Sequence, residues 1–200
     1  KGSYNACLTL ENSRLLLYGC TFVSLYSPLN PGAITLSLGN TKLGYDSIID
    51  QCYFYNCSGT DGGAIGFVSD YLLSRLNITN CIFINNAGGS GGAINFYGFQ
   101  GKIENCSFLN NFSPKEGSAI TIRVQKYENV DSVISLQNNI FELHEDNSLS
   151  LFAFNIVKNV FVLFTKNTIN ISDVNKNFKL FGISKYSKIN LDYLYFTNNI

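Results

Sequence analysis

The fold is decided by residues 62–108, which read GGAIGFVSDYLLSRLNITNCIFINNAGGSGGAINFYGFQGKIENCSF. Two signals in this stretch recur in step. Gly62-Gly63-Ala64-Ile65 returns as the same tetrapeptide at 91–94, and Asn80-Cys81-Ile82-Phe83 returns as Asn105-Cys106-Ser107-Phe108. Recurrence at a steady period is the signature of a repeat architecture. Such an architecture is expected to continue in further copies on either side.

Copies of both signals continue on either side. The tetrapeptide becomes Pro31-Gly32-Ala33-Ile34 in an earlier copy and Gly117-Ser118-Ala119-Ile120 in a later one. The Cys position is held in turn by Cys20, Cys52, Cys81, Cys106, Asn139, Asn167 and Leu194. The steps between these positions are 32, 29, 25, 33, 28 and 27 residues. The chain is thus expected to contain seven repeats of roughly 29 residues.

Each repeat holds three short segments in which apolar and polar residues alternate, separated by Gly, Asn or Ser. Alternation with period two predicts strands. The sequence therefore predicts an all-β fold, a right-handed parallel β-helix of about seven coils with three strands per coil, as one domain over residues 1–200. Right-handedness follows from the rule for parallel crossovers. A leucine-rich solenoid, with one strand and a helical return per repeat, is disfavoured by the three-strand alternation.

Equivalent positions of successive coils should stack into columns. Parity with the Phe two residues later places one column inside, and we expect it to hold Cys20, Cys52, Cys81 and Cys106 as reduced, buried thiols. A bridge between column neighbours is the alternative. Ala33, Ala64, Ala93 and Ala119 should form a second inward column. Cys57 occupies a turn position held elsewhere by Asn, and either a bridge or exposure is open for it.

Asparagine is in large excess, with 26 residues in a chain of 200. Many copies fall at expected turns, immediately before the Cys position or just after the Phe segment, as in Asn85-Asn86 and Asn110-Asn111. Asn tolerates left-handed backbone angles, and its amide can bond to its counterpart one coil away. We therefore expect ladders of turn asparagines rather than catalytic ones.

The GGAI tetrapeptides at 62–65 and 91–94 and the F-x-x-N pattern at Phe83–Asn86 and Phe108–Asn111 resemble the repeats of polymorphic outer-membrane proteins. The clear matches cover residues 30–125, whereas the last 75 residues keep the period and lose the motifs. The resemblance implies a pectin-lyase-like β-helix in an extracellular adhesin or structural protein of the cell surface. It brings no active site to this chain.

Composition excludes several classes of protein. The 14 basic and 14 acidic side chains give no net charge, which argues against a nucleic-acid partner. No apolar run approaches the roughly 18–20 residues of a membrane helix, so no membrane span is expected in this segment. The chain has neither a secretory signal nor any Met, and we expect a processed chain or a section of a longer one.

The sequence contains few candidates for catalytic or metal-binding residues. Many β-helices are polysaccharide lyases or hydrolases, which need clustered carboxylates. The outward column that contains Asp50, Glu104 and Asp192 places these acids on the second, fourth and seventh coils. His144 is expected in a charged loop, and Asp61 is one carboxylate without the repetition that a calcium site needs. No catalytic residue, cofactor or metal is therefore predicted.

Five N-x-S/T acceptors remain, at Asn56, Asn77, Asn105, Asn111 and Asn170. Asn77, at an outward strand position, and Asn170, near a turn, are the preferred glycan sites, followed by Asn56 and Asn111. Asn105 is expected to be blocked in a turn ladder.

The ends of the chain are expected to be in phase, since joining them would leave 12 residues between Phe196 and Leu8, as between Phe108 and Ile120. Two hypotheses follow: copies stack end to end, or the chain is a window of a longer β-helix. The sequence thus predicts a non-enzymatic extracellular rod, filament or adhesive module, whose partners are further coils, other copies, glycans or cell-surface molecules. A carbohydrate-active or glycan-binding β-helix is the alternative.

Overall fold

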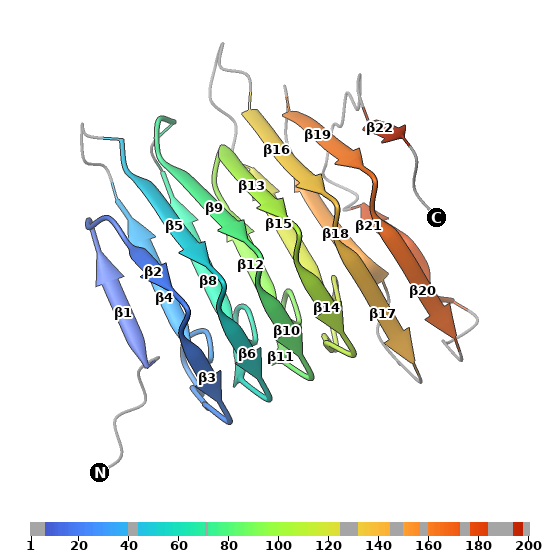
Figure 1. The fold of residues 1–200 in the computed structure, drawn as a ribbon, viewed down its shortest axis with the longest axis horizontal. Coiled ribbons are helices and arrows are strands. Elements are labelled where there is room, and N and C mark those ends of the chain that lie inside the picture. The colour runs from blue at the N-terminus through green and yellow to red at the C-terminus, as the bar shows by residue number, and fades with distance from the viewer. Residues whose placement is uncertain are drawn as a thin grey trace.

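The chain winds through three parallel β-sheets, visiting each sheet once per coil (Figure 1). The computed structural model describes residues 7–39, 44–70, 72–124, 132–144, 150–156, 160–172, 177–183 and 194–197. Within these ranges the regular elements are all strands. The fold is therefore the predicted parallel β-helix with three strands per coil. Its right-handed sense stays a prediction from the crossover rule.

Two of the sheets have seven strands and the third has six. The first sheet contains β1 (Leu8–Glu11), β4 (Ile34–Leu38), β8 (Ile65–Ser69), β12 (Ile94–Tyr97), β15 (Ile120–Val124), β18 (Ser150–Ile156) and β21 (Lys179–Ile183). The second contains β2 (Leu16–Tyr18), β5 (Asp46–Asp50), β9 (Arg75–Thr79), β13 (Gln100–Glu104), β16 (Ser132–Gln137), β19 (Val160–Thr165) and β22 (Leu194–Thr197). The third contains β3 (Thr21–Val23), β6 (Tyr53–Tyr55), β10 (Ile82–Ile84), β14 (Ser107–Leu109), β17 (Ile140–His144) and β20 (Thr168–Ser172). Two short strands, β7 (Ser58–Gly59) and β11 (Ala87–Gly88), pair with each other.

The last coil departs from the predicted register. Leu194-Tyr195-Phe196 was expected in the third sheet, yet β22 pairs with β19 in the second sheet, with Phe196 beside Phe164. The Leu-x-Phe spacing fits the alternation of either strand, and no Asn-Cys precedes it to fix the choice. In the described residues six coils carry all three strands, slightly fewer than the seven predicted. The expectation that the two ends of the chain are in phase treated Phe196 as the equivalent of Phe108 in the third sheet. Because Phe196 lies in the second sheet, that comparison no longer holds.

A stack of phenylalanines fills the interior. Neighbouring rings of Phe22, Phe54, Phe83, Phe108 and Phe141 have centroids 4.8–4.9 Å apart and planes within 11° of parallel. This spacing is that of adjacent strands, about 4.8 Å, because the rings occupy one position of the third sheet in successive coils. The alanine column is buried alongside.

The paired glycines of the GGAI motif have separate roles. The first has a left-handed backbone, with φ of 85° at Gly62 and 71° at Gly91. The second lies where coils approach most closely, since a Cβ on Gly63 would stand only 2.0 Å from the carbonyl oxygen of Gly92. The motif is therefore a requirement of coil stacking rather than of binding.

Candidate functional site

Six side chains form an inward column at the bend between the second and third sheets, which we call the Cys/Asn column. Its members are Cys20, Cys52, Cys81, Cys106, Asn139 and Asn167, and all but the half-buried Cys20 are buried. The thiol sulfur of Cys81 accepts the N–H of Cys52 at 3.4 Å, and Oδ1 of Asn139 accepts that of Cys106 at 3.0 Å. Thiol and amide thus serve the same purpose, which is to satisfy a buried N–H of the previous coil.

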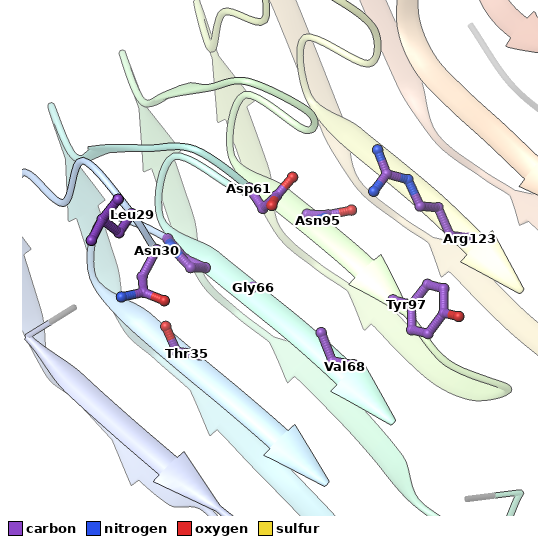
Figure 2. Close-up of a pocket in the computed structure, with 10 residues that line it drawn as sticks. Leu29, Asn30, Thr35, Asp61, Gly66, Val68, Asn95, Tyr97 and Arg123 are labelled. Atoms are coloured by element: carbon purple, nitrogen blue, oxygen red, sulfur yellow. The ribbon is translucent and has the colours of Figure 1, made fainter. Parts of the chain in front are cut away.

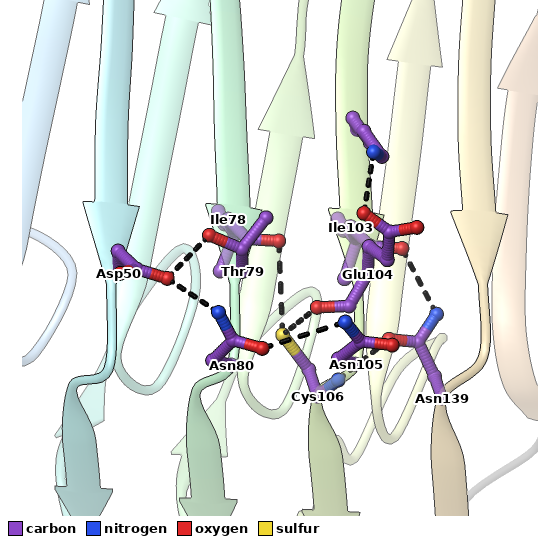
Figure 3. Close-up of polar contacts among 10 residues, drawn as sticks. Asp50, Ile78, Thr79, Asn80, Ile103, Glu104, Asn105, Cys106 and Asn139 are labelled. Carbon is purple, nitrogen blue, oxygen red and sulfur yellow. Dashed lines mark hydrogen bonds and ion pairs between the residues drawn. The ribbon is translucent and has the colours of Figure 1, made fainter.

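The same side chains also donate to backbone carbonyls. Cys106 donates to the carbonyl of Glu104 at 3.2 Å, and Nδ2 of Asn139 donates to that of Ile103 at 3.0 Å (Figure 3). Asn139 and Asn167 add an amide–amide bond of 3.0 Å. This interior amide ladder at the Cys position was not among the expected turn ladders, of which Asn105 and Asn80 form one bond at 3.4 Å.

Cys57, Asn86 and Asn111 form a second inward column after the third sheet. Oδ1 of Asn86 accepts the N–H of Cys57 at 2.9 Å, and Oδ1 of Asn111 accepts that of Asn86 at 3.0 Å. Cys57 is buried and has no disulfide, which answers the question that the sequence left open. The Asn of the F-x-x-N pattern is thus an internal hydrogen-bonding residue.

All six cysteines, each in the described part of the chain, are free thiols, and only Cys7 is exposed. Burial raises the pKa of Cys52 to about 11 and also raises the pKa of Cys57. The hydrogen bond with the Cys106 side chain, together with burial, raises the pKa of Cys81. These thiols are kept protonated, and they lack the thiolate character of a nucleophile.

The candidate glycan sites differ in exposure. Asn170 is exposed on β20, Asn56 is exposed in a left-handed turn, and Asn77 faces outward and half-buried on β9. Asn111 is only 2% exposed and donates Nδ2 to the carbonyl of Phe83 at 3.0 Å. A glycan on Asn111 is incompatible with this packing, so that candidate is withdrawn. Asn105 is exposed, and its Nδ2 bonds to Oδ1 of Asn80 at 3.4 Å.

Two outward acids of the second sheet, Asp50 and Glu104, each bond to neighbouring side chains (Figure 3). Oδ1 of Asp50 accepts from Thr79 at 2.6 Å and from Nδ2 of Asn80 at 2.8 Å. These two hydrogen bonds lower the pKa of Asp50. Glu104 forms an ion pair with Lys102. The in-register column continues to Thr197, where Asp192 had been expected, and Asp192 itself lies outside the described residues.

His144 is the last residue of β17, not part of a loop as expected. The ring Nδ1 of His144 lies 2.6 Å from the hydroxyl of Ser172. The backbone N–H of His144 donates to Oδ1 of Asn110 at 3.0 Å. In the described residues no group of three or more His, Cys, Asp or Glu side chains could hold a metal ion. Among those same residues, no helix is long and apolar enough to cross a membrane.

A groove lies on the outer face of the first sheet and is lined by described residues (Figure 2). It has a volume of about 340 Å³, near the lower end of small-molecule sites. Its floor is formed by Thr35, Gly66, Val68, Asn95, Tyr97 and Arg123, and its wall by Leu29, Asn30, Pro31 and Asp61. We call this site the first-sheet groove.

Local sequence explains why a wall stands over this sheet. A Cβ on Gly66 would lie 2.1 Å from Cγ of Pro31, so only glycine lets the loop before β4 rest against the sheet. Adjacent strands β4, β8, β12 and β15 bring the floor residues together. Arg123 is held by Ser90, whose Oγ accepts from Nη2 at 2.9 Å, and by Glu116 at 3.4 Å.

Three buried polar atoms of the groove have no hydrogen-bond partner within the described ranges: Oγ1 of Thr35, Oδ1 of Asn95 and Nε of Arg123. Asn95 is only 5% exposed. Leaving a buried polar group unpaired costs about 1–3 kcal/mol. Three such atoms in one groove therefore mark a place where the fold is not optimised for its own stability.

Sequence reasoning missed this site. Alternation places Thr35, Gly66, Asn95 and Thr121 in one outward column, and none of these residues is charged. Alternation also places Val68, Tyr97 and Arg123 in the next outward column, so the sequence holds a signal for this part of the floor. The wall from Leu29 to Pro31 could not have been foreseen.

In comparisons with known proteins, the chain matches no family model, no curated protein and no solved structure.

Proposed function

We propose that this protein is a non-enzymatic, extracellular structural β-helix that acts as a stiff rod and adhesive surface module. The observation that supports this role is the continuity of the interior. The Cys/Asn column bonds coil to coil at every step from Cys52 to Asn167, including the step where the thiol of Cys106 is followed by the amide of Asn139. Bending such a rod would disturb these bonds and the Phe stack together.

The extracellular location rests on the likeness to polymorphic outer-membrane protein repeats. Both motifs that carry it have a physical role in this fold: the glycines permit close coils, and the Asn of F-x-x-N lies in the second inward column. The exposed Asn170 and the outward Asn77 are available for glycans. A pectin-lyase-like surface protein is therefore the proposed family setting.

Further coils, from this chain or another copy, are the proposed partners at the first coil. The inward Leu8, Leu10 and Phe22 are only half-buried, whereas Ile34 and Phe54 one coil later are fully buried. A neighbouring coil would cover these side chains and pair the edge of β1 that has no partner strand among the described residues. Glycans and cell-surface molecules are proposed for the outer faces.

An assay for turnover tests the non-enzymatic role. We expect no new reducing ends when the protein is incubated with acidic and neutral polysaccharides, because Asp50 is kept ionised and Glu104 is paired with Lys102. The variants Asp50→Asn and Glu104→Gln serve as probes, and Asp46→Asn, exposed at the start of β5, as the control. Cleavage that both probes abolish and the control retains would overturn the proposal in favour of a carbohydrate-active enzyme.

A further inference from the structure

We infer that two copies of this chain pair side by side through the outer face of the third sheet. This surface consists of the outward residues of β3, β6, β10, β14 and β17, which lie in a row along the solenoid (Figure 1), and we call it the third-sheet face. The contact is lateral. It is therefore separate from the end-to-end contact proposed at the first coil, and it goes beyond the proposed function.

The third-sheet face is apolar at its centre and carries no charged side chain on β3, β6, β10 or β14. In-register pairing arranges its outward residues in two columns. One column reads Thr21, Tyr53, Ile82, Ser107 and Ile140, and the other reads Val23, Tyr55, Ile84, Leu109 and Glu142. Outward positions of a sheet that faces water are ordinarily polar, so this composition is typical of a covered face.

Within the described ranges no element covers this face. Val23, Tyr55, Ile82 and Ile140 remain 37–49% exposed. The rings of Tyr53 and Tyr55 stack with centroids 6.2 Å apart and planes 12° from parallel, so they present one broad aromatic surface. Contiguous exposed apolar side chains with a polar border mark sites of interaction.

Two rows of exposed turn residues with left-handed backbone angles border the face. The row before the strands contains Gln51, Asn80, Asn105 and Asn138, and the row after them contains Asn56, Asn85 and Asn110. An apolar centre without charges and a polar rim are the features of a protein–protein interface. Surfaces that bind lipid carry Lys and Arg around the apolar centre, so these uncharged amides favour a protein partner.

The relief of the face favours a second copy of this chain as that partner. A two-fold axis along β10 brings Ile82 of the two copies together and lays β6 of each copy over β14 of the other. The bulky Tyr53 then faces the small Ser107, which holds the same position of its strand. The strands of the two sheets run in one direction, as in aligned sheet packing. Each copy thus supplies both the projecting side chain and the space that receives it.

The size of the overlap sets the strength of the contact. Five strands, from β3 to β17, span about 24 Å along the solenoid, and the strand path from Gln51 to Asn56 spans about 17 Å. The flat area is therefore about 400 Å² per copy, against about 800 Å² in a standard interface. We expect a weak dimer that forms as concentration rises. The exposed Asn170 on β20 lies outside the overlap, and Glu142 lies on its outermost strand.

Sedimentation equilibrium of the full chain tests this pairing. The mass of the parent should rise from one chain towards two between about 10 µM and 1 mM. Ile82→Lys should stay at one chain mass throughout, because the two-fold axis brings the two lysines together. Val133→Lys is the matched control on the second sheet, with 41% exposure against 40% for Ile82, and it should associate as the parent does.

A mixture of two variants tests the position of the axis. Ile82→Glu alone should stay at one chain mass for the same reason as Ile82→Lys. An equimolar mixture of the two should recover the dimer, because lysine of one copy then faces glutamate of the other. Ile82 points outward from β10, so the circular dichroism of both variants should match that of the parent.

Four results would contradict the inference. These are a parent that stays at one chain mass up to about 1 mM, association of Ile82→Lys equal to that of the parent, loss of association in Val133→Lys, and a mixture that does not recover the dimer. Sedimentation of a monomeric parent with phosphatidylcholine vesicles would instead assign the third-sheet face to a lipid surface. Either kind of failure leaves the stiffness of the rod untouched.

Discussion

Asparagine has two distinct positions in each coil. One is the left-handed turn residue before the Cys/Asn column, with φ of 53° at Asn80, Asn105 and Asn138. The other is the inward residue itself, such as Asn139, whose amide bonds to the coils on both sides. The first follows from backbone tolerance and the second from hydrogen-bonding capacity. Gly19, Gln51 and Lys166 occupy the turn position in other coils, so that position is the more permissive.

The equivalence of thiol and amide predicts an asymmetry at Asn139. Asn139→Leu should lower the free energy of unfolding by about 2–5 kcal/mol, because it leaves the N–H of Cys106 and the carbonyl of Ile103 buried and unpaired. Asn139→Cys should cost less than half as much, because cysteine fills the same position one coil earlier. Urea unfolding measures both. Equal losses in the two variants would show that the column is filled by size alone.

The strands of the central coils follow from the sequence because several signals agree there. GGAI, Asn-Cys and the alternating Phe fix the register of β8 to β14 residue by residue. At β22 only Leu-x-Phe remains, which suits the second and third sheets equally, and the expected sheet was wrong. The first-sheet groove escaped because it depends on how the Pro31 loop folds back over Gly66, a tertiary contact that periodicity does not encode.

The Cys/Asn column also predicts the response of the molecule to alkali. The pKa of Cys52 is raised to about 11 by burial, so this thiol stays protonated in the folded state after its unfolded counterpart has ionised. Its contribution to stability is therefore complete below about pH 8.5, the ordinary thiol pKa, and is lost as pH rises through about 11. The midpoint of thermal unfolding should therefore fall between pH 7 and pH 11. The fall should be smaller in Cys52→Asn, which lacks this thiol.

Thiol labelling at pH 8 supplies the matching control. The exposed Cys7 should react within minutes, while Cys52, Cys81 and Cys106 should react only on global unfolding. Rapid native labelling of these three thiols, or a midpoint that does not change up to pH 11, would contradict a closed interior.

At the scale of the molecule, stiffness arises from repetition. Each described coil step except the last adds parallel backbone pairing in three sheets, and the steps from Phe22 to Phe141 each add a further ring to the Phe stack. A fully buried Phe side chain contributes about 1.5–3 kcal/mol, and a stacked ring pair adds about 0.5–1.5 kcal/mol. No coil can bend away without losing both, so the solenoid is expected to behave as one short rod.

The most direct test of the rod is a distance measured along it by pulsed electron spin resonance. Tyr18 and Thr165 lie in one outward column, five coil steps apart. Spin labels on Tyr18→Cys and Thr165→Cys, with Cys7→Ser to remove the exposed thiol, should therefore show one narrow distribution. Its centre should lie near 24 Å, allowing for the label arms, from the spacing of about 4.8 Å per step. A broad distribution, or a centre beyond about 40 Å, would contradict a continuous stiff β-helix.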